Sequence, residues 1–156
     1  MASSKSFQHP SRLLAMASIC AFKSDKLLEH SVGRIGCSLG DRAYVVPVSY
    51  AYDGSHVYGY TADSLKLHAM RENPLVCFEV DEIDSACDWR SVVASGEFEE
   101  LAADEAIVAL ELLSTRLRVV SAAAADTQCA AHTSVTRRGR YGVAYRIRLT
   151  EKVGRF

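Results

Sequence analysis

The chain has 156 residues, of which 49% are hydrophobic and 24% charged, and its net charge is −1. These values are typical of one globular domain and argue against disorder, fibrous repeats and a uniformly basic nucleic-acid-binding surface. The near-neutral total hides a segregation: residues 79–111 carry 11 acidic and 1 basic side chains, whereas residues 133–156 carry 7 basic and 1 acidic. We expect these two segments to contact each other, within one chain or across a dimer.

The N-terminal region contains an apolar run, residues 13–22, preceded by Lys5 and Arg12. The run is followed at once by charged residues and is shorter than the ~18 residues that a membrane-spanning helix needs. We therefore interpret residues 13–30 as a helix in a cytoplasmic protein that has no membrane partner. Residues 1–25 are expected to form a partly helical extension, and residues 26–156 a single domain.

The five cysteines show no CxxC spacing and the five histidines no HExxH spacing. Neither a structural zinc site nor a thioredoxin-like motif is indicated, and no metal site is predicted. Cys37 and Cys77 lie in apolar runs, which favours small buried side chains in a reducing compartment.

Residues 32–61 have a β pattern, with three runs rich in β-branched and aromatic residues at 32–38, 44–51 and 56–61. Turn signals separate the runs: Leu39-Gly40-Asp41-Arg42 after the first and Asp53-Gly54 after the second. Three strands joined by tight turns predict an antiparallel meander.

The rest of the chain alternates between helical and strand patterns. Asp63 is expected to cap a helix that runs to Arg71 and is stopped by Asn73-Pro74. Further strands are expected at 75–81, 90–101 and 143–150, and residues 121–136 are interpreted as a loop. Between them Asp104 is expected to cap a helix whose apolar face is formed by Ile107, Leu110, Leu113, Leu117 and Val120. Six strands and two or three helices predict a mainly β (α+β) fold, a small antiparallel barrel with flanking helices.

Two stretches carry the candidate chemistry. Thr61, Ser64 and Lys66 supply two hydroxyls and an ammonium at a helix start, a combination that binds phosphate, although an ordinary capped helix with a solvated lysine has the same pattern. Upstream, Pro47 lies inside a strand and marks an edge or a bulge. Trp89, Arg90 and Ser91 open a later strand and could border a flavin or nucleotide ring, or Trp89 could be a core residue.

Several of these stretches, taken in order, resemble a known family. They are Val32-Gly33-Arg34-Ile35-Gly36-Cys37, Tyr44-Val45-Val46-Pro47-Val48-Ser49-Tyr50, Val57-Tyr58-Gly59-Tyr60-Thr61-Ala62 through Lys66, Met70 to Phe78, Trp89 to Val93 with Gly96, and Tyr145-Arg146-Ile147-Arg148-Leu149. In order and spacing the chain resembles the FMN-binding split-barrel proteins of the pyridoxamine-phosphate-oxidase-like superfamily, and within it the Nim-type (nitroimidazole-resistance) branch. The resemblance extends from about residue 26 to the C-terminus.

The resemblance implies a six-stranded split barrel that forms a homodimer with two FMN molecules at the dimer interface. The strand flanking the isoalloxazine ring would be supplied by Val46, Pro47, Val48 and Ser49. Tyr60 and Thr61 would lie at the cofactor, and Ser64 and Lys66 would hold its phosphate. Trp89, Arg90 and Ser91 would reach the cofactor from the second subunit.

Two departures from the family pattern bear on the activity. Val93 stands where pyridoxamine-phosphate oxidase has an arginine for the substrate phosphate, and Tyr60 stands where Nim-type proteins often have a histidine. The resulting hypothesis is an FMN-dependent oxidoreductase acting on a small organic substrate, with Tyr60 as a candidate hydrogen-bond donor to that substrate and a nicotinamide as a candidate electron donor. The alternatives are a non-catalytic flavin or haem carrier or sensor on the same fold, and a deazaflavin in place of FMN.

Overall fold

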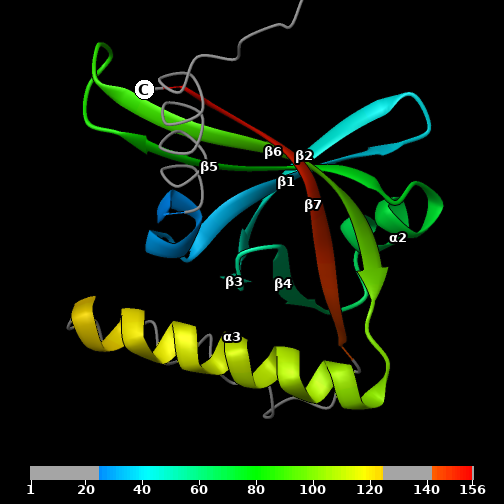
Figure 1. The fold of residues 1–156 in the computed structure, drawn as a ribbon. Coiled ribbons are helices and arrows are strands. Elements are labelled where there is room, and N and C mark those ends of the chain that lie inside the picture. The colour runs from blue at the N-terminus through cyan, green and yellow to red at the C-terminus, as the bar shows by residue number, and fades with distance from the viewer. Residues whose placement is uncertain (1–24, 125–141, 156) are drawn as a thin grey trace, which may run out of the picture.

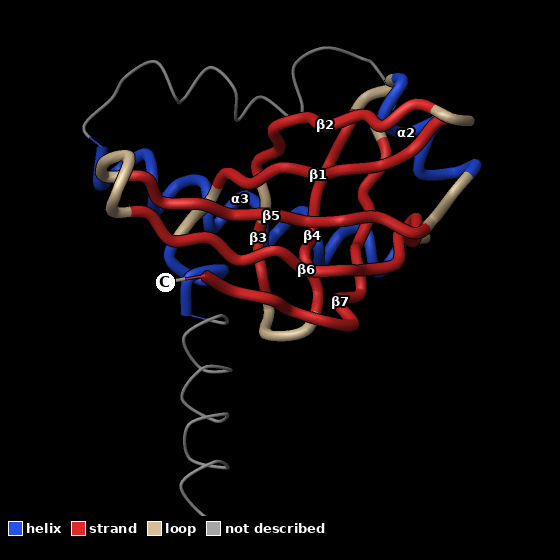
Figure 2. Tube along the Cα trace, turned by 90° about the horizontal axis from the view of Figure 1, so that it is seen from above, coloured by secondary structure: helices blue, strands red, loops and turns tan. Residues whose placement is uncertain are grey.

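The fold is built on one antiparallel sheet of seven strands in the order β2-β1-β5-β6-β7-β4-β3 (Figures 1 and 2). This computed structural model describes residues 25–124 and 142–155. The strands are β1 (Val32–Leu39), β2 (Arg42–Ser49), β3 (Ala51–Tyr52), β4 (His56–Thr61), β5 (Leu75–Ile83), β6 (Trp89–Glu100) and β7 (Val143–Arg155). The helices are α2 (Leu65–Glu72) and α3 (Ala103–Ala124), and a short helical segment precedes β1 at residues 25–29.

The sheet curls into a split barrel because its two edge strands follow each other in the chain. β2 pairs with β1 and β3 pairs with β4, at opposite ends of the strand order, yet only Tyr50 separates them. Tyr50 is fully buried; its backbone N–H donates to Ser31 O at 2.9 Å and its hydroxyl to Leu27 O at 2.8 Å. The mainly β split-barrel class is confirmed, with seven strands instead of six, because the predicted strand 44–51 is divided at this residue.

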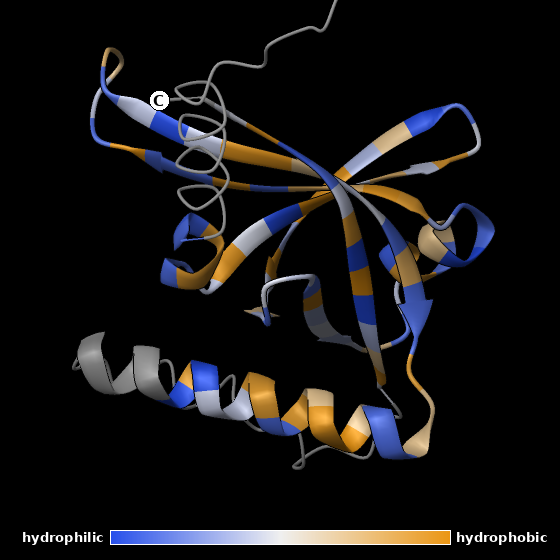
Figure 3. Ribbon diagram, viewed as in Figure 1, coloured by the Kyte–Doolittle hydropathy of each residue, from blue (hydrophilic) through white to orange (hydrophobic). Residues whose placement is uncertain are grey.

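Most strands begin where the sequence pattern predicts, but β5 ends two residues later and β7 five residues later than predicted. β1 and β2 form a hairpin whose turn residue Gly40 has φ +55°, and β3 and β4 form a second hairpin in which Gly54 has φ +106°. Both glycines occupy the left-handed region that other residues rarely adopt. Figure 3 shows hydrophobic residues alternating with hydrophilic ones along the strands, which is the period-two pattern of a sheet with one buried face.

The inner face of the barrel holds the hydrophobic core. Its largest fully buried members are Tyr50, Tyr145, Phe78, Leu27, Ile35, Leu67, Met70, Ile147, Val57 and Val92. Leu27 belongs to the segment before β1, and Leu67 and Met70 belong to α2. These two helical segments therefore cover the parts of the core that the sheet does not enclose.

β7 contains a bulge opposite β6. Ser95 pairs with Glu151, whereas the next residue, Gly96, pairs with Leu149, so Thr150 is the extra residue. The Thr150 hydroxyl donates to Ser95 O at 3.2 Å. A bulge of this kind reverses which face of the sheet the following side chains occupy.

The helix after β4 begins one residue later than predicted. Ser64, not Asp63, is the N-cap: its backbone is extended and its Oγ accepts a long hydrogen bond, 3.4 Å, from the Leu67 N–H. The helix ends at Asn73, whose N–H donates to Ala69 O at 2.9 Å just before Pro74, as the stop signal predicts.

α3 differs from prediction in extent and in its buried face. It continues to Ala124, four residues into the stretch interpreted as a loop, and residues 125–136 of that stretch lie outside the described part. Within residues 103–118 the buried residues are Ala109 and Leu113, and Leu110 and Leu117 are half-buried. Most of the predicted face is therefore correct, but Ile107 is 57% exposed and the smaller Ala109 is buried.

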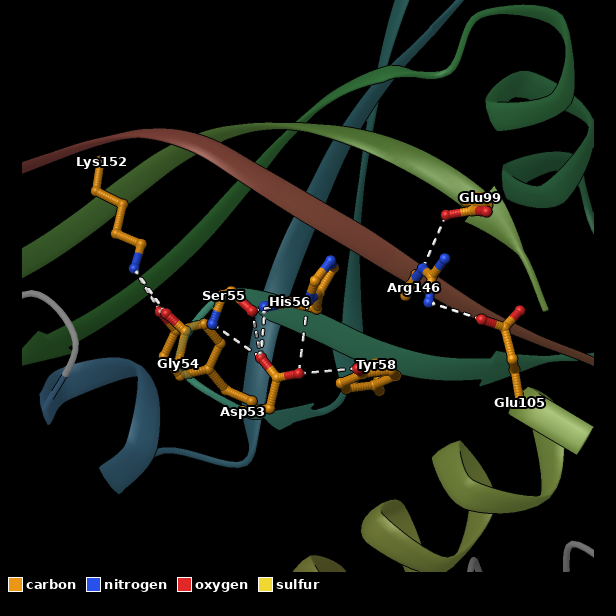
Figure 4. Close-up of polar contacts among 10 residues, drawn as sticks. Asp53, Gly54, Ser55, His56, Tyr58, Glu99, Glu105, Arg146 and Lys152 are labelled. Carbon is orange, nitrogen blue, oxygen red and sulfur yellow. Dashed lines mark hydrogen bonds and ion pairs between the residues drawn. The ribbon is translucent and has the colours of Figure 1, made fainter.

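The acidic and basic segments meet across β6 and β7, as their segregation predicts. Arg146 lies 2.8 Å from Glu99 on β6 and 3.1 Å from Glu105 on α3 (Figure 4), and Arg148 lies 2.6 Å from Glu97. These ion pairs join residues 79–111 to residues 133–156 within one chain. Because the pairs are largely exposed, each contributes little to the free energy of unfolding. Together they favour the observed positions of β6 and α3 beside β7.

The segment before β1 joins three parts of the molecule. Lys26 lies 2.8 Å from Glu82 on β5, and Tyr50 binds the Leu27 carbonyl. Arg116 on α3 donates through Nη2 to the carbonyl oxygens of Leu28, Glu29 (2.7 Å) and His30 (3.3 Å). A guanidinium at these carbonyls satisfies acceptors that the end of a helix leaves open.

We expect Arg116→Met to lower the free energy of unfolding by about 1–2 kcal/mol, because it leaves carbonyl acceptors without their charged donor. Arg118→Met is the matched control, since Arg118 is exposed on the same helix and, within the described part of the chain, bonds to Ser114 O of its own helix. Urea unfolding followed by circular dichroism measures both. Equal effects of the two substitutions would contradict the role assigned to Arg116.

Candidate functional site

The start of α2 brings two of the predicted hydroxyls together. Thr61, the last residue of β4, is 8% exposed, and its Oγ1 lies 3.3 Å from Ser64 Oγ and 3.1 Å from Ala62 O. The first turn of α2 contains no acidic residue. A helix N-terminus with hydroxyls and without carboxylates favours a bound anion.

Lys66 extends from this turn toward the end of the barrel. Its ammonium lies 5.9 Å from the centre of the Tyr145 ring on β7. Burial lowers the pKa of Lys66, and the neighbouring Cys37 on β1 opposes that change. Among residues 25–118 and 142–154, no carboxylate forms an ion pair with Lys66. Its charge is thus partly desolvated and not neutralised by these neighbours.

The four β2 residues predicted at the isoalloxazine ring alternate between the two faces. Pro47 and Ser49 are exposed on the outer face, whereas Val46 is half-buried and Val48 is buried in the core. β2 is an edge strand, which agrees with the position of Pro47, because proline lacks the N–H that a further strand would require.

Tyr60 and Thr61 lie on opposite faces of β4, as neighbours in a strand must. Thr61 is buried, while Tyr60 is half-buried on the face shared with His56 and Tyr58. The Tyr60 ring lies close to the backbone of Gly142, where an added Cβ would come within 2.1 Å of its Cζ. The two side chains therefore cannot both point at one ligand from the same side.

Trp89, Arg90 and Ser91 lie far from Lys66 in the same chain. They open β6 opposite Ile83, Glu82 and Asp81 of β5. In Figure 1 this end of the β5–β6 hairpin projects to the upper left, whereas α2 lies at the right. The structure thus brings Thr61, Ser64 and Lys66 together and leaves the Trp89 group at the other end of the sheet.

The outer face of the sheet carries an open groove of about 490 Å³. It crosses β2, β1, β5 and β6, and its lining includes Val45, Leu75, Cys77 and Ser95. Val45 is 63% and Leu75 69% exposed, and Cys77 is exposed too, so the expectation that Cys77 is a buried residue is wrong, whereas Cys37 is buried. Cys77 lies in the apolar run of β5, but it alternates with the buried Val76 and Phe78 and therefore faces outward.

A second polar cluster surrounds Asp53 in the β3–β4 turn (Figure 4). Its carboxylate accepts from the backbone N–H groups of Ser55 (2.8 Å) and His56 (2.7 Å), and from the hydroxyls of Ser55 (3.0 Å) and Tyr58 (2.8 Å). Burial alone would raise the pKa of Asp53, but these donors outweigh it and lower the pKa to about 2. Since the cluster satisfies itself, its role is to hold the turn.

Three residues at the Lys66 site were missed by the sequence analysis: Cys37, Gly59 and Tyr145. The barrel brings Cys37 of β1 and Tyr145 of β7 to Lys66, and Gly59 of β4 lies against the Tyr145 ring. Tyr145 was identified as a residue of the last strand and Cys37 as a buried cysteine, but strand patterns give no information on which strands face each other. The Gly59 position inside β4 was the one available signal, because a glycine within a strand often marks a close approach.

The sequence profile of one family, pyridoxamine 5′-phosphate oxidase, matches residues 24–155 of the chain. The chain belongs to the pyridoxamine 5′-phosphate oxidase family.

Solved structures agree with this assignment. An FAD-binding protein from Mesorhizobium loti is 29% identical, with a TM-score of 0.62 over 88% of this chain and 90% of that one. A candidate 5-nitroimidazole antibiotic resistance protein from Bacteroides thetaiotaomicron is 14% identical, with a TM-score of 0.60 over 86% and 81% of the two chains. At that identity the second match supports the fold alone.

One curated relative, an uncharacterised protein of Rhizobium meliloti, is 35% identical over 74 residues. The match covers 47% of this chain and 49% of the relative, so the chain spans about half the length of that relative. No helix within residues 25–124 and 142–155 has the length and hydrophobicity required to cross a membrane.

The Asp53 cluster predicts a pH-dependent contribution to stability. The folded-state pKa of about 2 is below the ordinary value of ~3.9, so the carboxylate stabilises the fold above pH ~4, and this contribution is lost as the pH falls through about 2. Because the side chain is one-third exposed, we expect Asp53→Asn to cost only about 1 kcal/mol at pH 6 and progressively less toward pH 2. Urea unfolding between pH 6 and pH 2 measures this.

The matched control is Asp41→Asn in the β1–β2 turn, where the side chain is exposed; it should leave stability almost unchanged at pH 6. A cost of Asp53→Asn that is the same at pH 6 and pH 2 would contradict the assignment.

Proposed function

We propose that the protein is a flavin-binding oxidoreductase that holds FMN between two copies of the chain and acts on a small organic substrate. The observation that carries the proposal is the partly buried Lys66 ammonium beside the Thr61 and Ser64 hydroxyls, in a member of the pyridoxamine 5′-phosphate oxidase family. A phosphate group has the charge and the acceptors that such a site requires.

The residues at the start of α2 fit a phosphate in three respects. Within residues 25–118 and 142–154, no carboxylate forms an ion pair with Lys66 that a bound anion would have to displace. Ser64 Oγ accepts a long bond from Leu67 N–H and lies 3.3 Å from Thr61 Oγ1, so its hydroxyl hydrogen would turn from Thr61 to an oxygen of the bound ligand. The helix N-terminus adds backbone donors and a positive dipole end.

Two observations favour a cofactor shared between two copies. β6 has 12 residues and spans roughly 36 Å at ~3.3 Å per residue. Trp89 is the first residue of β6, and the last residue of β6, Glu100, pairs with Tyr145, whose ring lies near Lys66. One FMN molecule is too short to reach both Trp89 and Lys66 of the same chain. The outer face of the sheet also exposes Val45, Leu75 and Val153, an apolar surface that a second copy would cover.

The flavin would supply hydride chemistry when bound, and the chain would supply binding and orientation. Lys66, Ser64 and Thr61 would hold the phosphate, and the outer face of β2 around Pro47 and Ser49 would flank the ring. Tyr60, half-buried on the outer face of β4, would donate a hydrogen bond to the substrate. Similarity to the FAD-binding protein of Mesorhizobium loti supports a flavin, and the strand and helix motifs support FMN as its form.

We expect the purified protein to bind FMN, with flavin absorbance that is bleached by a nicotinamide donor and restored by an added acceptor. Identification of the released cofactor by mass spectrometry separates FMN from FAD, deazaflavin and haem. A protein that stays colourless after titration with FMN and FAD would refute flavin binding. A bound flavin that no donor reduces would favour a carrier over an oxidoreductase.

The shared site predicts complementation between variants. Lys66→Ala removes the phosphate-binding charge and Arg90→Ala changes the group expected from the second copy, so each homodimer should bind FMN weakly. Mixed dimers formed by refolding the two variants together should regain one intact site of the two, because each copy supplies what the other lacks. Flavin fluorescence quenching at a fixed protein concentration measures the recovered sites.

Arg118→Ala is the control of equal charge change, and it should bind FMN like the unaltered protein. Mixed dimers that bind no better than the two homodimers would show that both groups act within one chain or that one of them has no role.

A further inference from the structure

Among the residues that the structure describes, the partner of the Lys66 side chain is an aromatic ring and not a carboxylate. Its ammonium lies 5.9 Å from the centre of the Tyr145 ring, within the range of a cation–π interaction. Lys66 belongs to the first turn of α2 and Tyr145 to β7, so the contact links the helix to the far side of the barrel.

The position of the Tyr145 ring is fixed by its neighbours. Gly59 on β4 pairs with Tyr145, and a Cβ at Gly59 would come within 2.2 Å of the Tyr145 Cζ. The ring can therefore lie against the β4 backbone only because residue 59 has no side chain. Phe98 supports the ring from β6, with the two centroids 5.6 Å apart, and Tyr145 is 1% exposed.

The choice of an aromatic partner has an electrostatic consequence. A carboxylate beside Lys66 would hold the ammonium equally well, but it would neutralise the charge and repel an incoming phosphate. The face of an aromatic ring attracts a cation through its quadrupole and carries no net charge. The remaining described group near the ammonium, the Cys37 thiol, is buried, and burial raises its pKa, so it is neutral.

We propose that Tyr145 is a positioning residue for the cofactor phosphate: its ring holds the Lys66 ammonium at the end of the barrel and leaves the positive charge available to the phosphate. This inference rests on the proposed function, in which a flavin phosphate binds at the start of α2. Gly59 and Phe98 serve the same end by fixing the ring.

The test compares FMN with riboflavin, which has the same ring but no phosphate. We expect Tyr145→Leu to weaken FMN binding roughly 3- to 30-fold, the range of a partly desolvated cation–π interaction, and riboflavin binding less than twofold. Tyr145→Phe retains the ring and should bind FMN within twofold of the unaltered protein. Dissociation constants are measured by quenching of flavin fluorescence.

Phe78→Leu is the matched control, because it removes a ring from the same core but one that packs against Tyr50 and not against Tyr145. It should change FMN and riboflavin binding by the same factor. In a Lys66→Met background, Tyr145→Leu should have no further effect on FMN, since the group that Tyr145 positions is then absent.

Tyr145 is buried, so Tyr145→Leu carries a risk of unfolding, and an isosteric comparison avoids it. Pentafluorophenylalanine in place of the phenylalanine of Tyr145→Phe keeps the shape of the ring and removes its attraction for cations. It should weaken FMN binding about 3- to 10-fold relative to Tyr145→Phe and leave riboflavin binding unchanged. In the apoprotein, faster acetylation of Lys66 in the fluorinated variant would report the released ammonium without any flavin.

The outcomes separate this inference from the proposed function. If the unaltered protein binds FMN no more tightly than riboflavin, the phosphate site is wrong and the role of Tyr145 fails with it. If the unaltered protein prefers FMN and the fluorinated ring has no effect on FMN binding, the phosphate site stands and the role of Tyr145 is wrong.

Discussion

The architecture depends on the burial of one residue, Tyr50. At Tyr50 the chain passes from β2, at one edge of the sheet, to β3, at the other edge. The fully buried side chain and the two hydrogen bonds of Tyr50 fix this connection. Its ring also meets Phe78 of β5 edge-on, with centroids 4.8 Å apart. Because the two edges are joined here, β4 and β7 are carried round to face β1, and Cys37 and Tyr145 come to the same end of the barrel. Without this closure, α2 would have no partner for Lys66.

The arginines that stabilise the fold differ from Lys66, the residue proposed to bind the ligand, in having carboxylate partners. Arg34, Arg71, Arg146 and Arg148 each have a carboxylate partner on a neighbouring strand or helix. These pairs neutralise the acidic and basic blocks locally, and they tie β1 to β5, β6 to β7 and α2 to the end of β6. A cation already paired in this way attracts a phosphate weakly. Lys66, at the start of α2, has no ion pair with a carboxylate of residues 25–118 or 142–154, so its charge would be the one available to the proposed phosphate.

Much of the fold follows from local patterns, whereas the site depends on contacts between distant parts of the chain. The β1–β2 hairpin, the turn at Gly54, β4 and the end of α2 were predicted because glycine turns, strand alternation and Asn73-Pro74 act locally. The expected meander was wrong, because β2 does not pair with β4 in the sheet. The division at Tyr50 was missed because the alternation of side chains continues through it, and only burial shows that the strand is broken. Most of the buried face of α3 was predicted, but apolar size suggested Ile107, whereas the smaller Ala109 is buried. At the site, the hydroxyls and Lys66 were predicted from the helix start, but Tyr145 and Cys37 required the barrel.

The extra residue in β7 sets the composition of two surfaces at once. Before Thr150, the outward side chains are Arg146 and Arg148, opposite the carboxylates of β6. After it the parity is reversed: Val153 faces outward beside Val93, and Lys152 turns inward, where it lies 4.9 Å from the centre of the Tyr52 ring. The outer face of β7 therefore carries two arginines before the bulge, and Glu151 and Val153 after it. Which residues of the second half of β7 face the core and which face outward is thus set by one added residue and not by their chemistry.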